Sequence, residues 1–285
     1  ENGNIIFGEG DVQITIGENI FISSEKFKYD KKTGLYKIFD NVHFKDKINN
    51  IKASGTEFIL SSFDNKILSK TKSKIFYDET YEIDLNSFEY NINDQKITSG
   101  DFVKIKDNIN NYFELYGFLF DLKTNEFIGK EIKFIDYQQN KYFLNEVMVN
   151  ADNDKLYGKK IKFLDNQQNK YFLNEVMINT DNDNLYGKDL NIEFHKSIFG
   201  NSSNDPRLKA KSVKIKDQSS FLKKGVFTSC SKDNDCPPWS MYAEEIEHDK
   251  IDQTINYKNA WLKIYDRPVV YFPRFSHPDP TVKRK

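Results

Sequence analysis

GKEIKFIDYQQNKYFLNEVMVNADNDKLY, residues 129–157, is followed directly by GKKIKFLDNQQNKYFLNEVMINTDNDNLY, residues 158–186. The two copies start 29 residues apart and differ only at positions 131, 135, 137, 149, 151 and 155. A short block that occurs twice in tandem is typical of repeat proteins, in which each unit stacks on its neighbours and forms no separate globule. The duplicated block therefore predicts a fold of stacked units.

The same period continues outside the duplicated block, in units that begin 29 to 35 residues apart. The unit starts are Ile20, Ile51, Tyr81, Phe113, Tyr142, Tyr171, Pro206 and Trp239. Two residues after the starts come Ile22, Ala53, Ile83, Leu115, Leu144, Leu173, Leu208 and Met241. Seven residues after the starts come Phe27, Phe58, Phe88, Phe120, Val149, Ile178, Val213 and Ile246. Because all of these residues are apolar, we predict two inward positions in each of eight units.

Polar residues alternate with the apolar positions, which predicts β-strands with one buried and one solvated face. The step from the second to the seventh residue is odd, so we expect a bulge or corner between them if both face inward. Each unit returns through a second strand that opens on Gly or Asn, as at Gly129, Gly158 and Gly187. We therefore predict an all-β fold of stacked two-strand units of about 30 residues each.

Glu146 and Glu175 conflict with this register. They lie four residues after a unit start, at a position that the register points inward. We expect either that both residues sit at the bulge or that the register slips there by one residue.

The overall composition excludes several classes of protein. The chain has 285 residues, and 42 Lys and Arg balance 43 Asp and Glu, so there is no basic surplus that would indicate a nucleic-acid partner. No apolar run reaches the length of about 18 residues that a membrane-spanning helix needs. The chain opens without a secretion signal, so we expect either a cytosolic protein or, preferably, a precursor whose start is missing. All seven prolines lie at or beyond Pro206, and the last twenty residues are too proline-rich for an interior strand, which predicts a linker.

The candidates for catalysis or metal binding are weak. His43, His195, His248 and His277 share no ligand spacing, and we predict no metal site. The Asp-Asn-Asp runs at 152–154 and 181–183 lack the Gly and terminal Glu of a calcium loop, so we expect solvated turns. No carboxylate pair is placed across a cleft, so we predict neither an enzyme nor a cofactor. Cys230 and Cys236 allow a disulfide, with each other or with other cysteines, which we favour over half of a metal site or two free thiols.

The inward face leaves two hypotheses open. The apolar positions either fill a dry core or, if the two strands of each unit splay apart, form a continuous apolar groove along the molecule. Periodicity does not distinguish a closed seam from an open one.

The C-terminal part of the chain resembles a known family. Ala260-Trp261-Leu262 and Pro268–Lys285 are similar to the segment that leads into the barrel of the lipopolysaccharide-assembly outer-membrane proteins, the LptD or organic-solvent-tolerance (OstA) family. Phe227–Cys230, Cys236–Trp239 and Ala243–Asp249 resemble the cysteine-bearing segment of that family. The likeness is specific from about Phe227 onward, and before that it consists of the repeat register.

This resemblance implies an elongated, open β-jellyroll whose apolar interior passes lipopolysaccharide (LPS) from a periplasmic bridge protein to an outer-membrane barrel. Residues 1–226 would be the jellyroll repeats, and residues 227–285 the last repeats, a cysteine-bearing loop and a linker into a barrel that this chain lacks. The implied location is the periplasmic side of the outer membrane. The implied groove-lining residues are Ile22, Phe27, Phe58, Ile83, Phe88, Leu115, Phe120, Leu144, Val149, Leu173 and Ile178.

The family also implies partners and a disulfide. An LptA-like bridge protein would pair with the edge strand at the N-terminal end, and an LptE-like lipoprotein would bind through the absent barrel. Cys230 would form the disulfide that links this domain to the barrel. Cys236 is a second candidate, however, and family members often carry an earlier cysteine that this chain lacks, so the pairing stays open.

Three other functions compete with the leading hypothesis of a transport conduit. The first is a stand-alone periplasmic LPS bridge protein of the same fold. The second is a polysaccharide-degrading solenoid enzyme, which would need acidic residues clustered on an outer face. The third is a structural β-solenoid with a closed, dry core.

Overall fold

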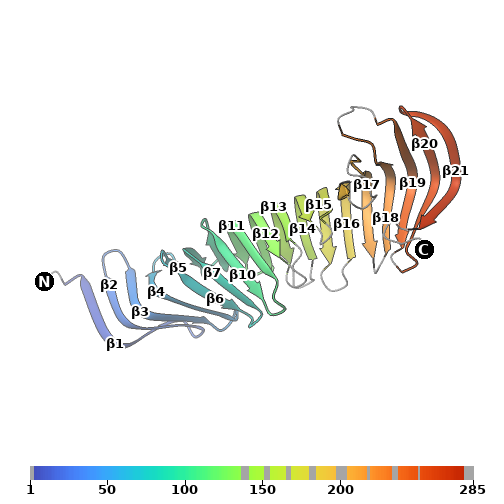
Figure 1. The fold of residues 1–285 in the computed structure, drawn as a ribbon. Coiled ribbons are helices and arrows are strands. Elements are labelled where there is room, and N and C mark those ends of the chain that lie inside the picture. The colour runs from blue at the N-terminus through green and yellow to red at the C-terminus, as the bar shows by residue number, and fades with distance from the viewer. Residues whose placement is uncertain are drawn as a thin grey trace. The chain divides into compact units, whose positions relative to one another are not determined.

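The computed structural model describes residues 3–135, 141–150, 155–164, 168–179, 184–196, 204–216, 219–232, 237–249 and 251–278. These residues form 21 β-strands, and the pairings between them are antiparallel, which confirms the all-β prediction. Within the described part of the chain, no helix has the length and apolar character needed to cross a membrane. The chain divides into two compact units, Glu1–Gln139 and Asn140–Lys285, which are described separately below (Figure 1). The boundary predicted at residue 226 stays a prediction.

The described residues of unit 1 form four long strands, six short strands and two further long strands. The strands are β1 (Ile5–Ile16), β2 (Ile20–Asp30), β3 (Leu35–Asp46), β4 (Ile51–Ser61), β5 (Lys66–Ser69), β6 (Ser73–Tyr77), β7 (Tyr81–Leu85), β8 (Phe88–Asn91), β9 (Lys96–Ser99), β10 (Val103–Asp107), β11 (Tyr112–Asp121) and β12 (Glu126–Ile135).

Unit 2 is a run of long strands that lie side by side in sequence order (Figure 1). The strands are β13 (Lys141–Asn150), β14 (Lys155–Leu164), β15 (Lys170–Asn179), β16 (Asn184–Glu193), β17 (Arg207–Lys216), β18 (Ser219–Thr228), β19 (Trp239–Asp249), β20 (Thr254–Ile264) and β21 (Arg267–Pro278).

Each long strand folds at a corner, where two consecutive residues point outward. In β13, Leu144 and Val147 are buried on the inner face, and the two residues between them are exposed. In the paired strand β14, Lys160 takes a φ of 52° at the same corner, a left-handed conformation that bends the strand. Because the corner spans an odd step, Leu144 and Val149 lie on the same inner face. This confirms the predicted corner.

The corner also resolves the conflict at the two glutamates. Glu146 and Glu175 are exposed corner residues on the outer face, which confirms the expectation that both sit at the bulge; the inward position that the register gave them does not hold. In β2, β17 and β19 the corner falls about two residues later in the unit. The residues four positions after the unit start are buried in these strands, namely Ser24, Ala210 and Ala243. Glu175 lies 2.6 Å from Lys188 on the neighbouring strand, and this carboxylate raises the pKa of the lysine.

Glycines at the corners leave room for leucines of the adjacent strand. A Cβ atom on Gly187 would lie 2.2 Å from Leu173 Cδ2, and one on Gly158 would lie 2.9 Å from Leu144 Cδ2. These distances are shorter than van der Waals contact, so close packing requires glycine beside the corner. The prediction that return strands open on these glycines was wrong, because Gly129, Gly158 and Gly187 are each the fourth residue of their strand.

The corner divides each unit into two arms. In unit 1, the first arm contains β6, β7, β10, the first halves of β4 and β11, and the second half of β3, which pairs with the first half of β4. The second arm of unit 1 consists of β5, β8, β9 and the second halves of β4 and β11. The inner faces of the two arms face each other. We call the margin of the arms farthest from the corner the mouth.

The proline-rich tail contains a strand where we expected a linker. Residues Arg267–Pro278 form β21, which pairs with β20 and has no other strand partner among the described residues. An edge strand tolerates proline because the missing N–H faces away from its single neighbour.

Candidate functional site

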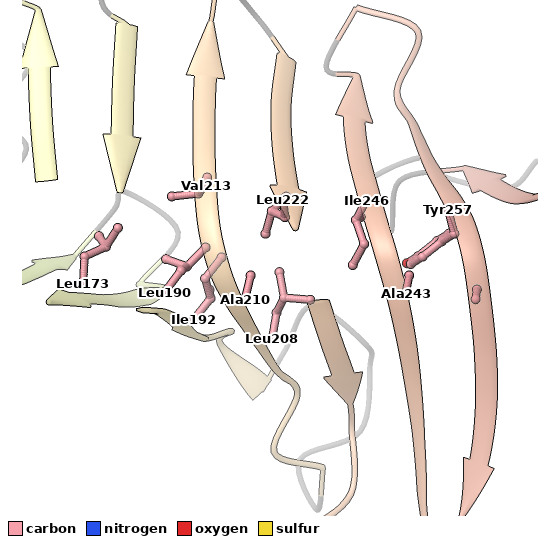
Figure 2. Packing of buried hydrophobic residues seen from close by; sticks show 11 residues of the cluster. Leu173, Leu190, Ile192, Leu208, Ala210, Val213, Leu222, Ala243, Ile246 and Tyr257 are labelled. Atoms are coloured by element: carbon pink, nitrogen blue, oxygen red, sulfur yellow. The ribbon is translucent and has the colours of Figure 1, made fainter. Parts of the chain in front are cut away.

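The inner face of unit 2 is a continuous apolar surface built from successive strands (Figure 2). Its buried residues are Leu173, Leu190, Ile192, Leu208, Ala210, Val213, Leu222, Ala243, Ile246, Tyr257 and Ala260. The half-buried apolar residues that pack against them are Tyr171, Leu185, Phe194, Ile215, Phe227, Met241, Ile255, Phe272 and Phe275. The strand alternation predicted from sequence places both groups on one face.

In β13 and β15, burial on this face is lower at the mouth than at the corner. In β15, Leu173 and Val176 flank the corner and are buried, whereas Tyr171 and Ile178 lie at the mouth and are half-buried. In β13, Tyr142 and Val149 are likewise half-buried at the mouth. Leu156 and Ile192, the register partners of Ile178 and Tyr171 on the neighbouring strands, are buried, at 3% and 8% exposure. The margin of unit 2 is therefore partly accessible to solvent, at its half-buried residues.

A ladder of aromatic rings lines one side of this mouth. Tyr142 stacks on Phe163 with ring centroids 4.6 Å apart, and Phe163 contacts Tyr171 at 5.1 Å. The opposite side carries aliphatic residues in register, where Ile178 pairs with both Leu156 and Leu185. The two copies of the duplicated block thus contribute the same apolar elements in succession.

The inner face of unit 1 is more tightly closed. Phe58, Ile83 and Phe120 are each 0% exposed. Rings from opposite arms touch here: Tyr77 of the first arm meets the ring of Phe120 of the second arm edge-on, with centroids 4.6 Å apart. This part of unit 1 forms a filled core between the two arms.

A buried polar cluster crosses from one arm of unit 1 to the other. Tyr90 Oη on β8 donates a 2.6 Å hydrogen bond to Asp46 Oδ2 at the end of β3. Asn49 Nδ2 donates to Asp46 Oδ2 at 2.8 Å and to Tyr90 Oη at 3.1 Å. Burial, followed by the hydrogen bond to Asp46, raises the pKa of Tyr90 far above its ordinary value. Sequence patterns did not reveal this cluster, because 44 residues separate Asp46 from Tyr90.

A second polar contact joins the same two arms. Tyr77 Oη, at the mouth end of β6, donates a 2.6 Å hydrogen bond to Asn125 Oδ1, in the turn before β12. Both contacts lie at the mouth and not at the corner.

The N-terminal end of unit 1 has a cavity of about 490 Å³ that opens to solvent. It lies beside the bulge of β1 between Glu9 and Val12. Its lining residues are Gly8, Glu9, Gly10, Asp11, Val12, Gln13, Ile14, Phe27 and Tyr36.

The residues predicted to line a lipid path lie on the inner faces of their units. Phe27, Val149 and Ile178 are half-buried. The buried ones are Ile22, Phe58, Ile83, Phe88, Leu115, Phe120, Leu144 and Leu173. Contact of these residues with lipid stays a prediction.

The other candidates from the sequence form no site in the described part of the chain. Cys230 is half-buried, has no disulfide partner among the described residues, and places its Sγ 3.7 Å from the carbonyl oxygen of Trp239. Cys236 and the runs at 152–154 and 181–183 lie outside the described residues. No three His, Cys, Asp or Glu side chains gather as metal ligands within the described ranges.

Comparison with known proteins gives a partial similarity. The chain matches no protein-family model. The LPS-assembly proteins LptD of Yersinia pestis bv. Antiqua, strains Antiqua and Nepal516, and of Yersinia pseudotuberculosis serotype I, strain IP32953, are each 38% identical to it over 68 residues. The aligned stretch spans 23% of this chain and 8% of the length of each relative. This similarity supports a relation to an LPS-transport family.

Proposed function

We propose that this chain is a periplasmic lipid-conducting domain of an LPS-assembly protein. The observation that carries the proposal is the apolar inner face of unit 2, which continues over successive strands and is half-buried at mouth residues such as Val149 and Ile178. The partial similarity to LptD supplies the class of lipid. In this proposal the domain binds and passes lipid at the outer membrane and performs no catalysis.

The physical requirement is a long surface of similar, weak apolar contacts. Moving an acyl chain out of water gains about 0.8 kcal/mol for each buried CH₂ group. A lipid with several acyl chains would stay trapped in one deep pocket, whereas a row of equivalent positions lets it advance stepwise. Val149 and Ile178, at the same position in the two copies of the duplicated block, are such equivalent steps.

The proposed supplier of lipid is an LptA-like bridge protein that adds a strand to β1. Among the described residues, β1 pairs with β2 only, and the strand of the bridge protein would pair with the other edge of β1 by β-augmentation. Exposed Ile5, Ile6 and Phe7 would contribute side-chain contacts to such a pairing. Lipid would leave towards an outer-membrane barrel that holds an LptE-like lipoprotein.

Neighbouring residues of β15 offer a matched test. Ile178 and Met177 are both half-buried and apolar, but Ile178 lies on the inner face and Met177 pairs with Tyr157 and Tyr186 on the outer face. A photo-crosslinking amino acid at position 178 should capture LPS in cells at least several-fold more efficiently than one at position 177. Equal capture at the two positions would overturn the proposal, because it would show no preference for the inner face.

A structural β-solenoid is the second candidate, favoured by the full burial of Phe58, Ile83 and Phe120 in unit 1. It predicts that neither position 177 nor position 178 captures LPS. The same experiment therefore separates the two candidates.

A further inference from the structure

Asp46 interrupts a row of apolar side chains on the inner face of unit 1. It pairs in register with Ile20 on one side and Ile51 on the other, and both isoleucines are buried. Asp46 itself is only 2% exposed. A carboxylate in such a row is costly unless its oxygens are hydrogen-bonded, so its presence calls for an explanation.

Turn formation explains only half of the hydrogen bonding of Asp46. Its Oδ1 accepts hydrogen bonds from the backbone N–H groups of Ile48 and Asn49, as the aspartates at other turns of the chain do. Asp30 and Asp249 form the same kind of turn but are half-buried at the surface. Asp46 differs because its Oδ2 faces the interior and accepts from a tyrosine of the opposite arm.

Tyr90 is placed so that it spans the space between the arms. It is 1% exposed, and its ring packs edge-on against Phe44 of β3 with centroids 5.8 Å apart. Tyr90 is the second inner residue after the corner in its arm, the place that Val149 and Ile178 hold in unit 2. At this position Val149 and Ile178 in unit 2 carry short aliphatic groups, whereas Tyr90 in unit 1 carries a ring and a hydroxyl that reach the opposite arm.

We propose that Asp46, Asn49 and Tyr90 form a gate that holds the two arms of unit 1 together and must open before lipid can occupy the inner face beneath it. This inference rests on the proposed function in lipid transport. A lipid chain cannot lie between the arms while the Tyr90 ring fills that space. When the arms part, water can hydrogen-bond to both the Tyr90 hydroxyl and the Asp46 carboxylate. The hydrogen bond between them can therefore break and re-form at a lower cost than a contact between apolar side chains.

The gate can be tested on the free protein by measuring the distance between the arms. Glu79, in the turn after β6, and Asn93, in the turn after β8, are exposed residues at the mouth ends of opposite arms. Both would be replaced by spin-labelled cysteines in the full chain carrying Cys230→Ser and Cys236→Ser. Tyr90→Phe should shift a substantial fraction of the molecules to longer distances. Tyr116→Phe, which removes a hydroxyl from an exposed corner residue, should leave the distances unchanged.

A second measurement keeps the proposal testable if Tyr90→Phe does not fold. The same two cysteines, joined by a reducible bis-maleimide, would tether the arms with the gate residues intact. Tethering should reduce LPS capture by a photo-crosslinker at Phe88 at least fivefold, and reduction of the tether should restore it. Because lipid is proposed to enter at β1 and to pass unit 1 first, capture by a separate probe at Ile178 should fall with capture at Phe88 and recover when the tether is reduced.

The outcomes separate the gate from the proposed function. Folded Tyr90→Phe protein with the parental distance distribution would overturn the gate, as would a tethered protein that captures LPS at Phe88 normally. Absence of capture at both Phe88 and Ile178, before and after tethering, would instead refute lipid transport and the gate that depends on it.

Discussion

Two alanine substitutions in β15 test whether the arms of unit 2 are open at the mouth. Leu173 lies beside the corner and is 8% exposed, whereas Ile178 is half-buried at the mouth of the same strand. Leu→Ala and Ile→Ala each remove three carbon atoms, so the two changes are matched in chemistry and differ in location.

The expected costs follow from burial. For Leu173, the lost transfer free energy of about 2.4 kcal/mol, at ~0.8 kcal/mol for each carbon, and the cavity left behind give about 3 kcal/mol. For Ile178, roughly half of the transfer term applies, and solvent can fill the space, so we expect about 1 kcal/mol. Leu173→Ala should therefore lower the free energy of unfolding by about 2 kcal/mol more than Ile178→Ala.

Equilibrium urea denaturation followed by far-UV circular dichroism would measure this difference in the full chain. The slope of free energy against urea must be the same for the two variants, since a changed slope indicates a changed unfolding reaction. Equal destabilisation by the two substitutions, within about 0.5 kcal/mol, would refute the open mouth and support a closed core.

Two further predictions concern corner packing and pH. Gly187→Ala should lower the free energy of unfolding by about 1–3 kcal/mol, because the new methyl group overlaps Leu173. The control is Gly100→Ala, whose new methyl group has no atom within 4 Å. In the same urea denaturation assay, its free energy of unfolding should stay within about 0.5 kcal/mol of the parent. Burial raises the pKa of Tyr257 to about 12, so the unfolded chain ionises first and stability falls as pH rises from about 10 towards 12. Tyr257→Phe should remove about 1 kcal/mol of the stability loss between pH 9 and pH 11, and identical pH profiles for parent and variant would contradict this assignment.

The stacked strands and their inner faces were predictable from local pattern. Leu144 and Val149 are separated by an odd step, which required a corner, and the structure places that corner between Leu144 and Val147. The position of the corner within the unit was not predictable, because a shift of two residues keeps the second and seventh positions inside. Glu146 was misplaced for this reason.

Features that depend on distant pairing were not visible in the sequence. Asp46 has the sequence context of an ordinary turn, and only the approach of Tyr90 from the opposite arm distinguishes it. Proline content predicted a linker at Pro268 and Pro273, but this segment forms strand β21, which among the described residues pairs with β20 alone, and proline is tolerated in a strand paired on one side. The sequence alone also left open whether the inner face is a dry core or a groove. In the structure, Phe120 in unit 1 is 0% exposed, whereas Ile178 in unit 2 is half-buried, so burial of the inner face differs between the units.

The central claim is that lipid travels along the inner face of the arms. Its most direct test is photo-crosslinking at both copies of the duplicated block, with probes at Val149 and Ile178 inside and at Met148 and Met177 outside. We expect LPS to be captured in cells at both inner positions, with similar inner-to-outer ratios of at least several-fold. Capture that is equal on the two faces, or absent at both inner positions in protein that is folded and exported, would contradict it.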